Sequence, residues 1–168
     1  MEWPILSLRV HGAAQEGAAG MASFAGRAGD GTEDPAGLAG ATILGSLTIP
    51  GRPEHVCEAR AFVAKALGEL HPSLEDAVLL TSELVTNAVM HSNSRSHGGS
   101  VNLLVLESVR GLRIEVADQG SDLSSPAVRG DLYASDGHGL FLVQALADQW
   151  GYLRDESGTT VWFWLGSG

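Results

Sequence analysis

The sequence predicts a two-layer α/β sandwich, in which a mixed, mostly antiparallel sheet carries helices on one face. The predicted elements follow in the order strand, helix, helix, strand, strand, long loop, helix, strand, strand, so helices stand between groups of paired strands instead of alternating with single ones. The chain also lacks G-x-x-x-x-G-K-[ST] and has no G-x-G-x-x-G after a strand. A doubly wound nucleotide-binding fold is therefore disfavoured.

Residues 1–40 are predicted to form a flexible extension of a domain that comprises residues 41–168. Between Gly12 and Ala41, eight of the thirty residues are glycine and ten are alanine. Such a segment buries little surface and loses much backbone entropy when it is ordered. Within the extension, the short segment 5–10 is the piece apolar enough to dock against another surface.

The domain is expected to begin with a strand and two helices. The stretch ATILGSLTIPG predicts a strand that ends at its Pro-Gly pair. A helix follows from Pro53, because proline suits a first turn, and a second helix over residues 74–91 follows Ser73, a good N-cap. Apolar residues at helical spacing mark both helices, namely Val56, Ala59, Val63, Ala66, Leu67 and Leu70 in the first and Leu74, Ala77, Val78, Thr81, Leu84, Val85 and Ala88 in the second.

Four further strands and a third helix are predicted after residue 100. Two alternating runs, which start at Val101 and Leu112, indicate a hairpin. The stretch 119–139 has no periodicity, and loops of that length are usually functional or disordered. Two final strands are predicted over 152–154 and 159–165. Between this loop and these strands, helical spacing of apolar residues predicts a short helix with Leu140, Val143, Leu146, Ala147 and Trp150.

The composition narrows the classes of partner. Twenty Asp and Glu against ten Lys and Arg give a formal net charge of −10 and a pI near 4.8. A field of that sign repels phosphate backbones and disfavours a general role with nucleic acid or anionic membranes. Cys57 is the single cysteine, so no disulfide forms within the chain. Since no signal-peptide pattern or membrane-spanning apolar run is found, we expect a cytoplasmic protein.

Three polar residues share one edge of the second helix. Glu83, Asn87 and His91 follow one another at a spacing of four, beside the apolar stripe. Asn87 offers a carbonyl oxygen to a hard metal ion, and Glu83 can accept a proton. Polar residues also border the buried stripe of ordinary amphipathic helices, and the spacing taken alone favours that interpretation.

Asp118 ends the second strand of the predicted hairpin. It has the same parity as Leu112, Ile114 and Val116, so its carboxylate points toward the layer that holds the core. A carboxylate in that position is costly unless a group donates a hydrogen bond to it. Backbone or serine groups could be the donor, and so could the exocyclic amine of a bound base.

The segment Gly137-His138-Gly139 opens the third predicted helix. Glycines there let the backbone approach a ligand closely, and the free N–H groups of a helix start favour anions. A plain helix-start turn is the alternative interpretation. On the last strand, Thr160 has the parity of Trp162 and Trp164, and both parities are rich in apolar residues. This favours a central strand, or a strand whose outer face meets a second protein.

Four segments carry these signals in a fixed order: ELVTNAVMHS (83–92), VADQG (116–120), GHGLFLV (137–143) and GTTVWFWL (158–165). Together they resemble the histidine-kinase-like ATPase superfamily, and within it the small bacterial anti-sigma-factor serine/threonine kinases and related ATP-binding regulators of actinobacteria. The resemblance spans about residues 42–168, and ELVTNAVMHS is its most specific segment.

The resemblance implies a Bergerat-type fold with an ATP site between helices and sheet, and a lid in the loop before Gly137. By the same resemblance, Asn87 would bind the Mg²⁺ that bridges the phosphates, and Glu83 would be the general base for the attacking hydroxyl. Asp118 would accept the adenine amino group, with Gly120 giving the base room. The remaining positions are Gly137, His138, Gly139 and Leu140 at the phosphates and Thr160 at the adenine end.

The chain departs from the family pattern at the first glycine box. Where the family has D-x-G-x-G, this chain has an acid, Asp122, at the second glycine position. Arg129 is the obvious cation of the predicted lid, and no lysine lies after residue 65. The charge of the phosphates is then expected to be met by Mg²⁺, helix N–H groups and Arg129 or His138.

The leading hypothesis is an ATP-binding regulator of a sigma factor or an anti-sigma antagonist, which phosphorylates the antagonist on Ser or Thr. The alternative is a non-catalytic binding module whose nucleotide only sets conformation or is lost. A sensor histidine kinase is disfavoured, because no helical dimerisation segment with a phosphorylatable histidine precedes the domain. The apolar outer face of the last strand would suit a homodimer.

Overall fold

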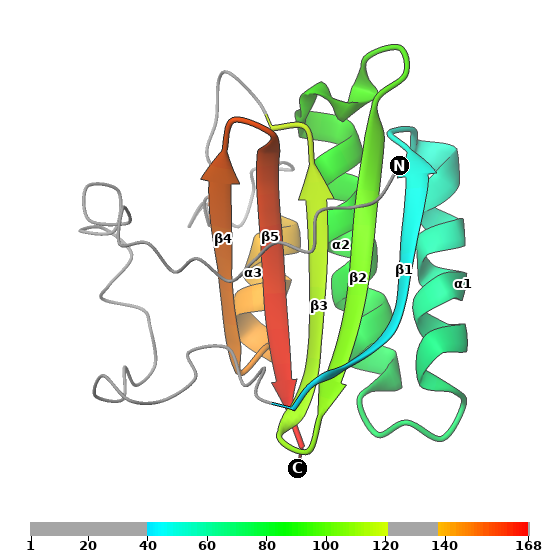
Figure 1. The fold of residues 1–168 in the computed structure, drawn as a ribbon, viewed down its shortest axis with the longest axis vertical. Coiled ribbons are helices and arrows are strands. Elements are labelled where there is room, and N and C mark those ends of the chain that lie inside the picture. The colour runs from blue at the N-terminus through cyan, green and yellow to red at the C-terminus, as the bar shows by residue number, and fades with distance from the viewer. Residues whose placement is uncertain (1–39, 121–137, 168) are drawn as a thin grey trace, which may run out of the picture. The chain divides into compact units, whose positions relative to one another are not determined.

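The computed structural model describes residues 40–120 and 138–167 (Figure 1). In chain order the elements are β1 (Thr42–Pro50), the 3-10 turn η2 (Pro53–His55), α1 (Val56–Leu67), α2 (Leu74–His91), the 3-10 turn η3 (Asn93–Arg95), β2 (Ser100–Ser108), β3 (Gly111–Asp118), α3 (His138–Leu146), β4 (Gln149–Asp155) and β5 (Gly158–Gly166). The predicted extension 1–40 lies almost entirely outside these residues and stays a prediction.

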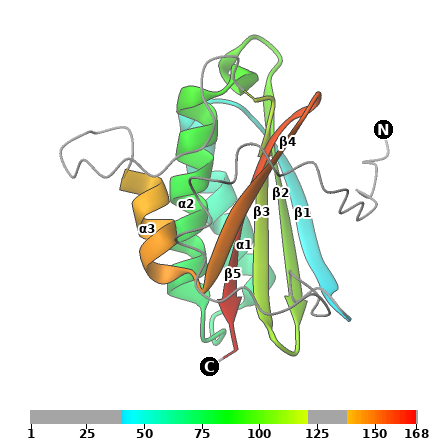
Figure 2. The same cartoon turned by 90° about the vertical axis from the view of Figure 1, so that its left-hand side faces the viewer.

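The strands form one sheet in the order β1-β2-β3-β5-β4, and every pairing between them is antiparallel. The three helices lie side by side on one face of this sheet, with α2 between α1 and α3 (Figures 1 and 2). The predicted two-layer α/β fold is thereby confirmed. No helix in the described ranges is long and apolar enough to cross a membrane.

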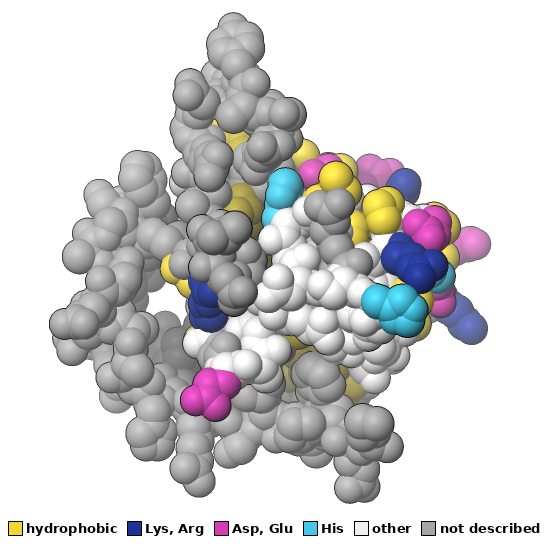
Figure 3. Space-filling model, turned by 90° about the horizontal axis from the view of Figure 1, so that it is seen from above, with side chains coloured by type: hydrophobic (Ala, Val, Ile, Leu, Met, Phe, Trp, Pro, Cys, Tyr) yellow, Lys and Arg dark blue, Asp and Glu magenta, His cyan; other side chains and the backbone are white. Residues whose placement is uncertain are grey.

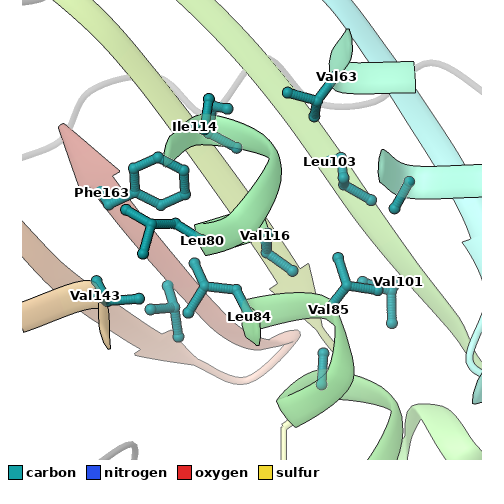
Figure 4. Close-up of a cluster of buried hydrophobic side chains, with 14 of the residues drawn as sticks. Val63, Leu80, Leu84, Val85, Val101, Leu103, Ile114, Val116, Val143 and Phe163 are labelled. Atoms are coloured by element: carbon teal, nitrogen blue, oxygen red, sulfur yellow. The ribbon is translucent and has the colours of Figure 1, made fainter. Parts of the chain in front are cut away.

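The core lies between the sheet and the helices. In Figure 4, Leu80, Leu84 and Val85 of α2 lie against side chains of the sheet, of α1 and of α3. The largest fully buried side chain is Phe163 of β5, which is 0% exposed. Helix α2 contacts both neighbouring helices and the middle strands of the sheet, so it packs at the centre of the core. The fully buried sheet residues beside it in Figure 4 include Val101, Ile114 and Val116.

Strand parity follows the prediction. Val161, Phe163 and Leu165 belong to the core, whereas Trp162 and Trp164 lie on the face that the described helices leave open. On that face Arg113 makes two contacts. Its guanidinium carbon lies 4.1 Å from the ring centre of Trp162, and its Nε donates to Glu115 at 2.7 Å.

Several local expectations differ from the structure. Leu70 was expected on the apolar stripe of the first helix, but α1 ends at Leu67 and Leu70 is 98% exposed. Trp150 was expected on the third helix, but α3 ends at Leu146 and Trp150 lies in β4, opposite Phe163 of β5. Trp150 does follow Leu146 at a helical spacing, but it is placed in β4 because it pairs with the neighbouring strand β5. Ser73 occupies the N-cap position of α2 without a side-chain capping hydrogen bond, and its own N–H donates to His71 Nδ1 at 3.1 Å.

Candidate functional site

Glu83 and Asn87 lie on the flank of α2 that is turned away from α1. The side chains of α2 that line the groove beside α1 are Leu74, Glu75, Val78, Leu79 and Ser82. With 100° per residue, Glu83 and Asn87 point more than a quarter turn away from the centre of that set, toward the side where α2 contacts α3. Both are half-buried, whereas His91, predicted on the same edge, is exposed at the end of the helix.

The Asp118 turn, which comprises residues 118–120, follows β3 at the upper end of the sheet in Figure 1. The backbone N–H of Gly120 donates to Asp118 Oδ1 at 2.6 Å, and Gly120 has a φ of +70°, which favours glycine. A Cβ on Gly158 would collide with the carbonyl oxygen of Asp118. The start of β5 therefore crosses the turn in backbone contact, and only glycine fits there.

Burial raises the pKa of Asp118 above its ordinary value. The hydrogen bond from Gly120 and the positive charge of Arg154 act in the opposite direction and offset only part of this effect. The carboxylate is thus kept in a partly dehydrated position with acceptor capacity to spare. A donor from a ligand would stabilise its charged form.

The residue beside Asp118 on the core-facing side of β5 is Thr159, which is 4% exposed and directly opposite Asp118 in the register. Thr160 was the predicted residue, but it pairs with Ala117 and lies on the open face of the sheet. The nearest side-chain atom to a Cβ built on Gly120 is Thr159 Oγ1, at 3.7 Å. The parity that Thr159 shares with Val161 places it on the core side of β5.

The described start of α3 lies on the same side of α2 as Asn87. The far end of α3 is fixed beside the end of β5, because the N–H of Asp148 donates to the carbonyl oxygen of Trp164 at 3.0 Å. The N-terminus of α3 is therefore directed toward the end of the sheet that holds the Asp118 turn (Figure 2). His138 and Gly139 are its first residues.

Leu140 is 8% exposed and packs in the core, so its backbone rather than its side chain is available to a ligand. The other predicted residues of this region, Gly137, Asp122 and Arg129, lie outside the described residues. Their predicted contributions to the phosphate end stay predictions.

Within residues 40–120 and 138–167, no three His, Cys, Asp or Glu side chains gather to hold a metal ion by themselves. The donor set is consistent with Mg²⁺ that arrives with a polyphosphate. Mg²⁺ is usually held by one or two protein oxygens together with phosphate oxygens and waters, and the half-buried carboxamide of Asn87 supplies such an oxygen.

Comparison with known proteins places these elements in a family context. The family model described as "Histidine kinase-like ATPase domain" matches residues 49–165, a span that begins near the end of β1 and ends within β5. The serine-protein kinase RsbW of Bacillus pumilus is 32% identical over 131 residues, which cover 68% of this chain and 80% of that protein. RsbW of Bacillus velezensis is 30% identical over 129 residues with the same coverage, and RsbW of Oceanobacillus iheyensis is 29% identical over 116 residues, or 61% of this chain and 73% of the relative.

Proposed function

Because the chain belongs to the histidine kinase-like ATPase domain family, we propose that it binds Mg-ATP and transfers the γ-phosphoryl group to a serine or threonine of a partner protein. One observation carries the proposal. The C-terminal half of α2, which holds Glu83 and Asn87, the Asp118 turn and the start of α3 come from separate parts of the chain, and their backbones lie toward the same end of the domain (Figure 2).

The Asp118 turn is the proposed adenine end. The exocyclic amine of adenine would donate to Asp118, whose partial burial makes such a donor favourable. Gly120 and Gly158 keep side chains away from this position, and the hydroxyl of Thr159 is near enough to support the base or a bridging water. Thr160 retains at most an indirect role through the strand that it shares with Thr159.

The α2 flank is the proposed phosphate end. Mg²⁺ held by Asn87 would neutralise the negative charge of the phosphates. The protein itself has a net charge of −10, so its overall field does not attract them. The attacking hydroxyl oxygen of the partner forms a bond to the γ-phosphorus while the bond to the β–γ bridging oxygen breaks, and ADP leaves. Glu83 takes the hydroxyl proton.

The partner class follows from the relatives. Each relative described above is named a serine-protein kinase, and this supports a protein hydroxyl as acceptor. Following the sequence resemblance, we expect the partner to be an anti-sigma antagonist or a sigma factor, and the site of action to be the cytoplasm. A homodimer through the open face of the sheet stays a prediction, which the mass of the purified chain measured by light scattering tests.

The full chain, γ-labelled ATP, Mg²⁺ and a candidate antagonist test the proposal directly. Glu83→Gln is expected to lower phosphate transfer by about 10²-fold or more, as for loss of a general base, with little change in ATP affinity. Glu75→Gln is the matched control, because Glu75 is on the same helix but on the α1 side. Transfer that survives Glu83→Gln contradicts the assigned base. If calorimetry detects no ATP binding up to millimolar concentration, the chain is a binding module without a nucleotide.

A further inference from the structure

Ser94 joins the end of α2 to the Asp118 turn. This serine lies in η3 and is 1% exposed. Its hydroxyl donates to the carbonyl oxygen of Ser100 at 2.8 Å and accepts the backbone N–H of Gln119 at 3.0 Å. One residue earlier, the N–H of Asn93 donates to the carbonyl oxygen of Gly120 at 2.7 Å. Both residues that follow Asp118 are thereby hydrogen-bonded to the segment after α2.

The backbone around Ser94 leaves it little room to move. A Cβ on Gly51 or on Gly99 would collide with the carbonyl oxygen of Ser94, and the N–H of Gly51 donates to the Gly99 carbonyl at 3.0 Å. The N–H of Ser94 donates to Ser92 Oγ at 3.0 Å, and that hydroxyl donates to the carbonyl oxygen of Ala88 at 2.6 Å. Ser94 is therefore connected without a gap to the last turn of α2, next to Asn87.

Few charged side chains are seen in the middle of the described surface at this end of the molecule (Figure 3). Seen from above in Figure 3, backbone and uncharged polar side chains occupy the middle of the described surface, and charged side chains lie toward its sides. The described contacts that join the Asp118 turn to this segment are the hydrogen bonds from Gln119 to Ser94 and from Asn93 to Gly120.

We propose that Ser94 is a positioning residue that sets the Asp118 turn relative to α2 and thereby determines the selectivity of the site for adenine over guanine. The inference rests on the proposed ATP-binding function. In the proposed complex Asp118 binds the exocyclic amino group of the base, and Asn87 holds the phosphates through Mg²⁺. The distance between these two residues therefore decides which base can place its amino group at Asp118. The hydroxyl of Ser94 holds these two residues at a constant separation. Without it, the N–H of Gln119 loses the acceptor that ties the turn to η3, and the turn is free to shift.

The test compares Ser94→Ala with Ser96→Ala, a control on an exposed serine of the same segment. Kd values for Mg-ATP and Mg-GTP are measured by calorimetry, and exchange of the Gln119 amide is followed by NMR without nucleotide. Ser94→Ala is expected to weaken ATP binding about tenfold, as for the loss of one hydrogen bond, to lower the ATP preference over GTP about fivefold or more, and to speed exchange at Gln119. Ser96→Ala is expected to leave all three unchanged.

A double-mutant cycle with Asp118→Asn shows whether Ser94 acts through the turn. In the Asp118→Asn background, Ser94→Ala is expected to change ATP affinity by less than twofold. Independent, additive effects, or a lower Tm with an unchanged ATP-to-GTP ratio, overturn the inference and leave ATP binding itself intact. If the wild-type chain binds no nucleotide, the proposed function fails first, and the selectivity role falls with it. If Ser94→Ala does not fold, Ser94→Cys replaces the hydroxyl oxygen by a larger sulfur that fills the site and makes only a weak hydrogen bond, and an unchanged ratio of ATP to GTP affinity in that variant is equally decisive.

Discussion

Replacement of Thr81 by valine is expected to stabilise the protein. Thr81 is on the sheet-facing side of α2 and is 0% exposed, and its Oγ1 has no hydrogen-bond partner. Threonine in a helix usually donates to a carbonyl oxygen three or four residues earlier, which removes part of the cost of burying its hydroxyl. In this helix the hydroxyl is buried without that compensation.

The expected gain can be estimated from the cost of an unpaired hydroxyl. A buried polar group without a partner costs about 1–3 kcal/mol. Valine has nearly the same shape, so neither a cavity nor a clash should reduce the gain much. We expect Thr81→Val to raise the free energy of unfolding by about 1–2 kcal/mol, which corresponds to about 3–8 °C in Tm for a domain of this size.

Urea denaturation of the full chain measures the effect, with an unchanged slope as a check that the unfolding transition itself is the same. Thr86→Val is the matched control, because Thr86 is on the same helix but exposed. Thr86→Val makes the same chemical change but removes a hydroxyl that is exposed to water, so the free energy of unfolding should stay within about 0.5 kcal/mol of the wild-type value. If Thr81→Val is no more stable than Thr86→Val, the hydroxyl is hydrogen-bonded in solution and the reasoning is refuted.

Three further predictions concern the sheet. Burial raises the pKa of Asp118 above its ordinary value of 3.8, so the folded chain binds a proton at this carboxyl more tightly than the unfolded chain does. The contribution of Asp118 to the free energy of unfolding therefore falls as the pH rises above 3.8 through the raised pKa. The stability of Asp118→Asn relative to wild type should therefore be greater at pH 7 than at pH 4, and the variant should bind ATP more weakly; an equal difference in stability at the two pH values would contradict this. Gly158→Ala would place a Cβ against the carbonyl oxygen of Asp118 at a φ of +149°, so it should lower the free energy of unfolding by about 2 kcal/mol or more. No change in urea denaturation would contradict the close backbone contact between Gly158 and Asp118. Phe163→Ala should cost about 3–5 kcal/mol, since the ring is fully buried, and a loss below 1 kcal/mol would place it outside the core.

Much of the fold could be predicted because the periodicity of apolar residues reports which side is buried. The stripe on α2 was predicted from Leu74 to Ala88, and Ala77, Leu84 and Val85 within it are indeed buried. The hairpin formed by β2 and β3 followed from alternation, and its register pairs Leu103 with Val116. These features depend on residues close in sequence, where spacing alone determines the side that a residue faces.

Contacts between distant segments could not be predicted in the same way. Trp150 fits a helical spacing from Leu146, and only the pairing with Phe163 shows that it is in a strand. Thr159 and Ser94 gain their roles from partners far along the chain: Thr159 lies opposite Asp118 in the register, and Ser94 is 25 residues from Gln119. Parity places Thr159 on the core side of its strand, but a single sequence shows neither its pairing with Asp118 nor the hydrogen bond between Ser94 and Gln119.

Thr81 and Asp118 are two polar groups that cost the folded chain stability, and their surroundings separate a packing defect from a site. Thr81 is enclosed by the core, so no ligand can reach its hydroxyl, and its removal should improve the protein without loss. Asp118 is only partly buried, ends a strand, and is flanked by glycines that keep side chains away from it. A bound amine can therefore recover the energy that burial of this carboxylate costs, and binding supplies a reason to keep it. The same reasoning predicts that Asp118→Asn and Thr81→Val both stabilise the chain, whereas only Asp118→Asn impairs binding of ATP.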